Sequence, residues 1–370
     1  MALHPTKTFP KRAAVFCAVL AATTLSIASG CGGGGGSSST TPVQTTPTVT
    51  TNPAVTAKIL YSVDSVDYTV DEYTANQSGA VTPTATISTG SQNLPTAIAG
   101  DASGNLYVSV NSNGTNSVGE ILVFTGAATT PTRTITLAAP ATGYMYQVSS
   151  MTTDSMNNLY VAASGAPLLT GLTGSFVAIF VYAPGATGTA SPLRTISGAA
   201  TTLKGGPGSS GMAQMSMDSK DNLYVANSGG SPGTAVLMFP AGASGNVAPT
   251  VITGPTYAPT GVALDAQDNI YISQSQSGPF GVIPSAVYVF AKGSGPSAMP
   301  TRTIMGTATG QNLYLNNIHV DSGGNIFVAQ VADGHQAFLV YSATANGNVA
   351  PSSTLSPARG STLDGQFYLK

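Results

Sequence analysis

The chain has 370 residues, with 12 basic and 14 acidic side chains, a net charge of −2 and only 7% charged residues. This composition excludes the basic stripe by which proteins bind nucleic acid. With no tryptophan and two cysteines, the fold must depend on packing rather than on disulfides, and the chain is long enough to bury a large core.

The first 30 residues have the pattern of an export signal. A basic start (Lys7, Lys11, Arg12) precedes the apolar run 13–27, and small residues then lead to Cys31. The run is too short to span a membrane as a helix. We therefore assign 1–30 to a signal peptide.

The small residues directly before Cys31 resemble the lipobox of bacterial lipoproteins, with Ala28 where leucine is usual. The resemblance implies that the Cys31 sulfur receives a diacylglyceryl group. An ordinary cleavage site with a free cysteine is the alternative. Since Cys17 is lost with the signal and Cys31 is the only other cysteine, we expect lipidation. The membrane is then one partner, and the protein is exported and anchored at the outer membrane or cell surface.

Residues 31–56 follow as a tether rich in Gly, Ser, Thr and Pro, with no charged residue. Such a segment is flexible to extended and can hold a domain up to about 75 Å from a membrane. Beyond the signal, nine basic residues stand against 14 acidic ones, a net charge of −5. Residues 57–370 form the remaining domain, which we expect to be monomeric.

A phrase of eight residues recurs five times in that domain. It reads DASGNLYV from Asp101, DSMNNLYV from Asp154, DSKDNLYV from Asp218, DAQDNIYI from Asp265 and DSGGNIFV from Asp321. The steps between these aspartates are 53, 64, 47 and 56 residues. An internal repeat of this length indicates one supersecondary unit copied around a ring or along a stack.

Each unit contains four short strands. The first strand is the apolar run before the aspartate, and the second is the NLYV stretch after it. The third strand ends in an aromatic residue, and the fourth begins at a proline. The aromatic-to-proline distance is 10 residues in five of six copies and 7 residues in the copy from Phe124 to Pro131. Alternation and β-branched residues favour strands over helices. Repeated four-stranded units predict an all-β fold, a β-propeller of antiparallel blades.

The chain ends set the number of blades. Residues 59–87 supply strands two to four of a unit that lacks its first strand, and the tail contains a shortened copy, LDGQFYL. This C-terminal strand can join the N-terminal blade and close the ring, which removes an exposed sheet edge. We therefore expect six blades, with seven as the alternative if the tail does something else.

The units resemble those of the NHL-repeat type of propeller over about residues 57–370, on the Asp-x-x-Gly-Asn-aliphatic-Tyr-Val phrase. This resemblance specifies the fold and little about function, because such propellers include lyases, lactonases and binding modules. The repeated aspartates are calcium ligands or, as we expect, acceptors that hold a tight hairpin. The turns lack the dense acidic series of a calcium loop.

Neither propeller enzyme pattern fits this chain. The resemblance to lactonases implies a Glu, Asn and Asp metal set, but Glu72 and Glu120, the only glutamates, belong to third strands. The lyases imply several zinc-ligand histidines, and beyond the signal only His319 and His335 occur. We assign no catalytic residue, metal ligand or cofactor. A hydrolase or lyase with a site in the central channel stays the alternative.

Three features are candidate sites. His319 replaces a small residue on an inner strand, so it lines the channel or, as we expect, makes a structural hydrogen bond. An acidic cluster (Asp64, Asp67, Asp71, Glu72) binds a cation or, as we expect, forms a solvated edge. Four tyrosines in the connections to first strands plug the core between blades, which we expect, or form a platform for a ligand: Tyr144, Tyr146, Tyr257 and Tyr314.

The loops that vary in length, between strands two and three and between successive units, emerge on the same side of an up-and-down blade. They include long inserts at 164–176 and 273–285. Variation on one rim of a constant scaffold is typical of a binding face. The sequence therefore predicts a lipid-anchored envelope propeller that binds a protein or a polysaccharide through this rim.

Overall fold

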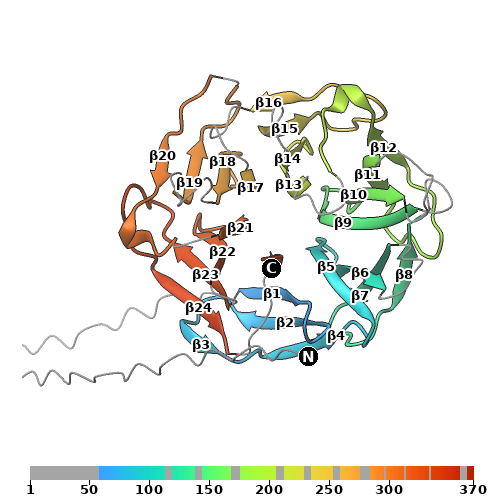
Figure 1. The fold of residues 1–370 in the computed structure, drawn as a ribbon, viewed down its shortest axis with the longest axis horizontal. Helices are drawn as coiled ribbons and strands as arrows, with labels where there is room; N and C mark the ends of the chain where they lie inside the picture. Colours follow the sequence, from blue (N-terminus) through green and yellow to red (C-terminus); the bar gives the residue numbers. More distant parts are fainter. Residues whose placement is uncertain are drawn as a thin grey trace, which may run out of the picture. The chain divides into compact units, whose positions relative to one another are not determined.

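Antiparallel strands make up nearly all of the computed structural model, in which six sheets, five of four strands and one of five, form a ring (Figure 1). The six-bladed β-propeller predicted from the repeats is confirmed. The structure describes residues 58–370 except 113–118, 138–143, 168–175, 206–211, 229–234, 253–258, 276–283, 296, 312–313, 333–334 and 359–364. Within these residues, no helix is long and apolar enough to cross a membrane.

The blades follow the chain in order, each from its inner to its outer strand. Blade 1 has β25 (Phe367–Leu369), β1 (Ile59–Asp64), β2 (Thr69–Thr74) and β4 (Ala85–Ser88). Blade 2 has β5 (Asn93–Gly100), β6 (Asn105–Ser112), β7 (Glu120–Thr125) and β8 (Arg133–Thr136). Blade 3 has β9 (Tyr144–Thr153), β10 (Leu159–Pro167), β11 (Phe176–Tyr182) and β12 (Arg194–Ser197).

The second half of the ring repeats this order. Blade 4 has β13 (Met212–Met217), β14 (Leu223–Asn227), β15 (Ala235–Phe239) and β16 (Thr250–Ile252). Blade 5 has β17 (Pro259–Leu264), β18 (Ile270–Gln274), β19 (Ala286–Phe290) and β20 (Arg302–Ile304). Blade 6 has β21 (Tyr314–Val320), β22 (Ile326–Ala332), β23 (His335–Tyr341) and β24 (Ser353–Pro357), with β3 (Gly79–Val81) added outside. Two 3₁₀ turns, Ala199–Thr201 and Thr307–Thr309, precede blades 4 and 6.

The C-terminal strand closes the ring, as the tail predicted. Strand β25 pairs antiparallel with β1 as the inner strand of blade 1, and Lys370 N–H donates to the Ile59 carbonyl at 2.8 Å. The Phe367 side chain is buried against Phe338 of blade 6, with ring centroids 5.1 Å apart. The first and last blades thus share one apolar cluster, so the two ends of the domain are held together.

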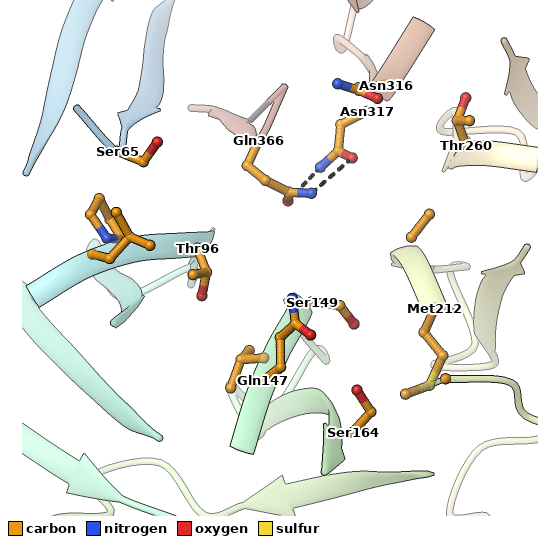
Figure 2. Close-up of a pocket in the computed structure, with 15 residues that line it drawn as sticks. Ser65, Thr96, Gln147, Ser149, Ser164, Met212, Thr260, Asn316, Asn317 and Gln366 are labelled. Carbon is orange, nitrogen blue, oxygen red and sulfur yellow. Dashed lines mark hydrogen bonds between the residues drawn. The ribbon is translucent and has the colours of Figure 1, made fainter. Parts of the chain in front are cut away.

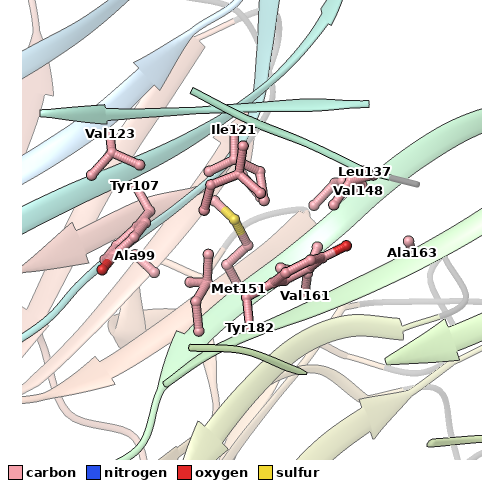
Figure 3. Close-up of a cluster of buried hydrophobic side chains, with 13 residues drawn as sticks. Ala99, Tyr107, Ile121, Val123, Leu137, Val148, Met151, Val161, Ala163 and Tyr182 are labelled. Carbon is pink, nitrogen blue, oxygen red and sulfur yellow. The ribbon is translucent and has the colours of Figure 1, made fainter. Parts of the chain in front are cut away.

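Apolar side chains fill the spaces between neighbouring blades (Figure 3). Between blades 2 and 3, Tyr107 and Ile121 of one blade meet Val161 and Tyr182 of the other. Alternate residues of the same strand point to opposite faces of the blade: Val161 packs against blade 2, and its neighbour Tyr160 packs against blade 4. Both faces of each blade are therefore covered, which explains the nearly continuous apolar strands. Burial of each large apolar side chain contributes about 1.5–3 kcal/mol.

The repeated aspartates hold tight hairpins between the first and second strands, as we expected. Asp101 Oδ1 accepts hydrogen bonds from the backbone N–H groups of Ser103 and Asn105, both at 2.9 Å, and Oδ2 accepts from Asn105 Nδ2 at 2.7 Å. The residue before the asparagine has a positive φ in all five turns, which favours Gly, Asn and Asp: Gly104, Asn157, Asp221, Asp268 and Gly324.

Neighbouring turns are also joined side by side. Asp221 accepts hydrogen bonds from the N–H and hydroxyl of Ser155 at 2.8 and 2.6 Å, and Asp268 accepts from Ser219 at 2.8 and 2.7 Å. Lys292 also contacts Asp268 at 2.6 Å. The hydrogen bonds from Lys292 and Ser219 lower the pKa of Asp268 to about 2. We call this side of the ring the hairpin face, and it is held together from blade to blade.

The constant distance of 10 residues from the aromatic to the proline also has a structural reason. The Gly-rich turn of this segment forms a parallel bridge to the outer strand of the preceding blade at Ile135↔Gly188, Ile196↔Gly245 and Ile304↔Gly347. In blade 1 the same contact is longer and forms β3 beside β24. In the described part of the chain, the shorter 7-residue turn of blade 2 makes no such bridge. In blades 1, 3, 4 and 6 this segment therefore links the blade to the preceding one in the ring.

Candidate functional site

The opposite side of the ring carries the connections of variable length, and we call it the loop face. A cavity of about 280 Å³ opens there at the mouth of the central channel. It is lined by the beginnings of the inner strands together with the β1–β2 turn (Figure 2). The rigid hairpin face and the cavity thus lie at opposite ends of the inner strands.

A bulge in each inner strand of blades 2 to 6 positions the lining side chains. The pairing with the second strand shifts by one residue in each blade, and the residue left unpaired lines the cavity; in blade 6 both Asn316 and Asn317 are left unpaired and line it. Such bulges change the direction in which a side chain points and are frequent beside functional sites. In every case this residue stands five positions before the repeated aspartate: Thr96, Ser149, Ala213, Thr260 and Asn316.

The floor of the cavity is a pair of carboxamides. Asn317 Nδ2 donates to Gln366 Oε1 at 2.8 Å, and Gln366 Nε2 donates to Asn317 Oδ1 at 3.3 Å (Figure 2). Both residues also line a second cavity of about 250 Å³ toward the hairpin face. The pair therefore lies between the two halves of the channel and joins blade 6 to the closing strand of blade 1.

A third carboxamide crosses between three blades. Gln214 is buried, and its Oε1 accepts from the backbone N–H groups of Val262 at 3.1 Å and Ile318 at 3.0 Å. Its Nε2 donates to the Ile318 carbonyl at 2.8 Å. A side chain on Gly261 would collide with Gln214, since a Cβ there would lie 2.5 Å from Oε1. Gln214 thus pairs with backbone groups of β17 and β21, the inner edge strands of blades 5 and 6.

Among the described residues, the lining of the loop-face cavity is uncharged. Its 15 residues include nine with hydroxyl or carboxamide groups and none that ionises near neutral pH: Ser65, Thr96, Gln147, Ser149, Ser164, Thr260, Asn316, Asn317 and Gln366. Such groups both donate and accept hydrogen bonds. They suit a neutral polar ligand better than an ion.

No protein-family model and no curated protein matches the chain. Among solved structures, a protein of unknown function from Bacteroides caccae is similar, with TM-score 0.57 and 10% identity, over 85% of this chain and 98% of that one. A luciferin-regenerating enzyme also matches, with TM-score 0.47 and 16% identity, over 80% of this chain and 92% of that one. A glucose dehydrogenase-like protein of Thermus thermophilus matches with TM-score 0.42 and 13% identity, over 68% of this chain and 80% of that one. At these identities, the similarity to the Bacteroides protein shows the fold alone.

His319 both lines the channel and makes a structural hydrogen bond, the two roles considered from the sequence. It lines the hairpin-face half of the channel, and its Nε2–H donates to the Phe367 carbonyl of β25 at 2.9 Å. Its ring packs edge-on against Phe367, with centroids 4.6 Å apart. Burial lowers the pKa of His319 to about 4, against the opposing effect of the hydrogen bond to Phe367. The neutral imidazole therefore helps to hold the closing strand.

The other predicted site residues have different outcomes. Tyr314 is 56% exposed at the start of β21, so the expectation that it plugs the core is wrong. The side chains of Tyr144, Tyr146 and His335, and all of Tyr257, lie outside the described residues, as does Cys31. The two long inserts are likewise described only in part.

The expectation of a solvated acidic edge in blade 1 is wrong for two of its four members. Asp64 and Asp71 are only 2% and 1% exposed. Asp71 accepts hydrogen bonds from Thr86 Oγ1 at 2.9 Å and the Tyr73 hydroxyl at 3.3 Å. Burial raises the pKa of Asp64, although the N–H groups of Asp67 and Val66 act the other way. Across the described residues, no group of three or more His, Cys, Asp or Glu could hold a metal ion.

Proposed function

We propose that this chain is a lipid-anchored binding module of a bacterial cell envelope, with a propeller of the NHL-repeat type that holds a polysaccharide at its loop face. The observation that carries the proposal is the neutral, hydrogen-bonding cavity at the channel mouth, built from bulges repeated in five blades. Neutral hydroxyl and carboxamide groups match the hydroxyl groups of a polysaccharide.

The place of the cavity supports this proposal. It lies at the end of the inner strands where the connections of variable length begin and end, whereas the hairpin face is made of nearly identical turns. Binding residues are often carried by variable loops on a rigid scaffold. The net charge of −5 beyond the signal also disfavours anionic partners.

The anchor is proposed from the sequence around Cys31 and the uncharged tether 31–56. The tether would leave the loop face accessible at a distance from the membrane. Replacing Cys31 by serine is expected to move the protein from the membrane fraction to the soluble fraction, with loss of the diacylglyceryl mass. Membrane retention of the Cys31→Ser variant would contradict the anchor.

Binding agrees with the channel residues better than catalysis does. Within the lining that the structure describes, His319 is the one imidazole and there is no carboxylate. General acid–base catalysis needs a titrating group that is accessible to the substrate. The Nε2–H of His319 is already hydrogen-bonded to the Phe367 carbonyl.

The test is a binding screen with the full chain carrying Cys31→Ser, against purified envelope polysaccharides and, separately, envelope proteins. We expect retention of a polysaccharide and its loss after digestion with glycosidases. Retention of a protein alone, or turnover of a lactone or glycoside by the same preparation, would overturn the polysaccharide assignment.

A further inference from the structure

The loop-face cavity specifies its ligand more closely than the proposed function requires. Figure 2 shows the labelled hydroxyl and carboxamide side chains around a common space. They come from every blade except blade 4, which contributes Met212 there. We infer that this cavity holds a single uncharged sugar ring, the end or side branch of a glycan, in hydrogen bonds to the bulge residues. This inference rests on the proposed function and adds the ligand class and the residues that select it.

The cavity has unused hydrogen-bonding capacity. The hydroxyls of Thr96 and Thr260 each make one hydrogen bond to a serine behind them, at 2.8 Å to Ser109 and 3.3 Å to Ser273. A hydroxyl offers one donor and two acceptor positions, so each keeps capacity for a ligand. Within the part of the chain that the structure describes, the Asn316 carboxamide makes no hydrogen bond. A carboxamide can both donate to and accept from the hydroxyls of a sugar.

One arc of the cavity is apolar. At blade 4 the bulge residue is Ala213, and Met212 and Gly205 complete the lining there. A sugar ring presents hydroxyls at its edge and C–H groups on its faces. It can therefore place C–H groups against blade 4 and direct its hydroxyls to the bulge residues of the other blades. A ligand that is polar all around would leave this arc uncovered.

Size and charge narrow the ligand further. The cavity volume of about 280 Å³ is at the low end of ligand pockets, which are about 300–1,000 Å³. It can take one small ring but not a folded domain. Because no lining residue that the structure describes is charged, binding should not depend on salt, which screens only interactions between charges. An anionic sugar would meet no cationic side chain among these described lining residues.

Tyr314 lies at the same end of β21 as Asn316, two residues earlier, and its ring is exposed. An aromatic ring with an apolar body and a polar tip can contact a second sugar outside the cavity. The cavity would then hold the terminal ring, and Tyr314 would add affinity only for a longer chain.

The experiment is isothermal titration of the full chain carrying Cys31→Ser with methyl glycosides of glucose, galactose, mannose and N-acetylglucosamine, at 50 and 500 mM NaCl. Methyl glucuronide is the charged match, and the disaccharides of any binding sugar follow. We expect a neutral glycoside to bind equally at both salt concentrations. Binding of methyl glucuronide alone, or a strong salt dependence, would overturn the inference.

The variants separate the site from the fold. Asn316→Ala and Thr260→Ala should each weaken glycoside binding about 5- to 10-fold, the effect of one lost hydrogen bond. The matched controls Asn76→Ala and Thr344→Ala change exposed residues remote from the cavity and should leave it unchanged. Tyr314→Ala should weaken the disaccharide but not the methyl glycoside. Thermal melting of every variant checks that it is folded.

The outcomes are distinguishable from those of the proposed function. If a polysaccharide binds but no methyl glycoside does, or if the Asn316 and Asn76 variants lose binding equally, the inference falls and the binding module stands. If neither polysaccharide nor glycoside binds, both fall. If a glycoside binds and only the cavity variants weaken it, both are supported.

Discussion

Replacing Phe367 by alanine should destabilise the whole propeller, although it changes one residue of a three-residue strand. The Phe367 side chain is 1% exposed and packs against Phe338 and His319, with ring centroids at 5.1 and 4.6 Å. Truncating a buried phenylalanine costs about 3–5 kcal/mol, which includes the cavity left behind. Because these contacts join blades 6 and 1, the loss should lower the free energy of unfolding of the entire ring.

The assay is urea unfolding followed by circular dichroism. Phe367→Leu keeps most of the volume and should cost less than about 1.5 kcal/mol. Tyr314→Ala removes an exposed aromatic and should change stability by less than about 0.5 kcal/mol. A loss below about 1 kcal/mol for Phe367→Ala would show that β25 is not an integral part of blade 1, and would refute the closure.

Three further predictions concern polar groups. His319 has a folded pKa of about 4 and an unfolded pKa of 6.5, so its contribution to the free energy of unfolding is complete above pH 6.5 and is lost as the pH falls toward 4. Urea unfolding should give about 2 kcal/mol less stability at pH 5 than at pH 7, and His319→Gln should reduce this dependence on pH. Asp154→Ala removes the carboxylate that accepts from Met156 and Asn158 and should cost about 2–3 kcal/mol. A chelator should leave the melting temperature unchanged, because the donors that hold Asp154 are amide groups of its own turn. Gln214→Ala leaves three buried backbone groups unpaired and should cost about 3 kcal/mol or more. A melting temperature within about 2 °C of the parent, roughly the shift for 1 kcal/mol in a domain of this size, would contradict the bridge.

The repeat made most of the fold predictable. Five copies of the aspartate phrase and a sixth unit without its first strand left one place for the tail LDGQFYL, and β25 occupies it. Such a prediction works because a blade with an open edge is unfavourable and the sequence contains one matching strand. The hairpins at Asp101 and its equivalents followed from the chemistry of the same residues.

The site was harder to predict, for physical reasons. The residue five before each aspartate is Thr, Ser, Ala, Thr or Asn, four polar residues and one apolar residue that alternation alone would have assigned to a regular strand. A bulge depends on the pairing of two strands, so the sequence of one strand alone does not predict it. Gln214 is hydrogen-bonded to Ile318, which is 104 positions away, so the local sequence pattern does not predict this contact. The expectation for the acidic cluster was wrong because Asp71 finds hydroxyl donors inside its blade.

The most direct test of the binding site is a map of backbone amide chemical shifts during titration of the labelled full chain, carrying Cys31→Ser, with a neutral methyl glycoside that binds. The account predicts that the largest changes lie at the five bulges, from residue 96 in blade 2 to residue 316 in blade 6, and that the hairpin turns change little. Changes centred on the aspartate turns, or on the outer strands, would contradict it.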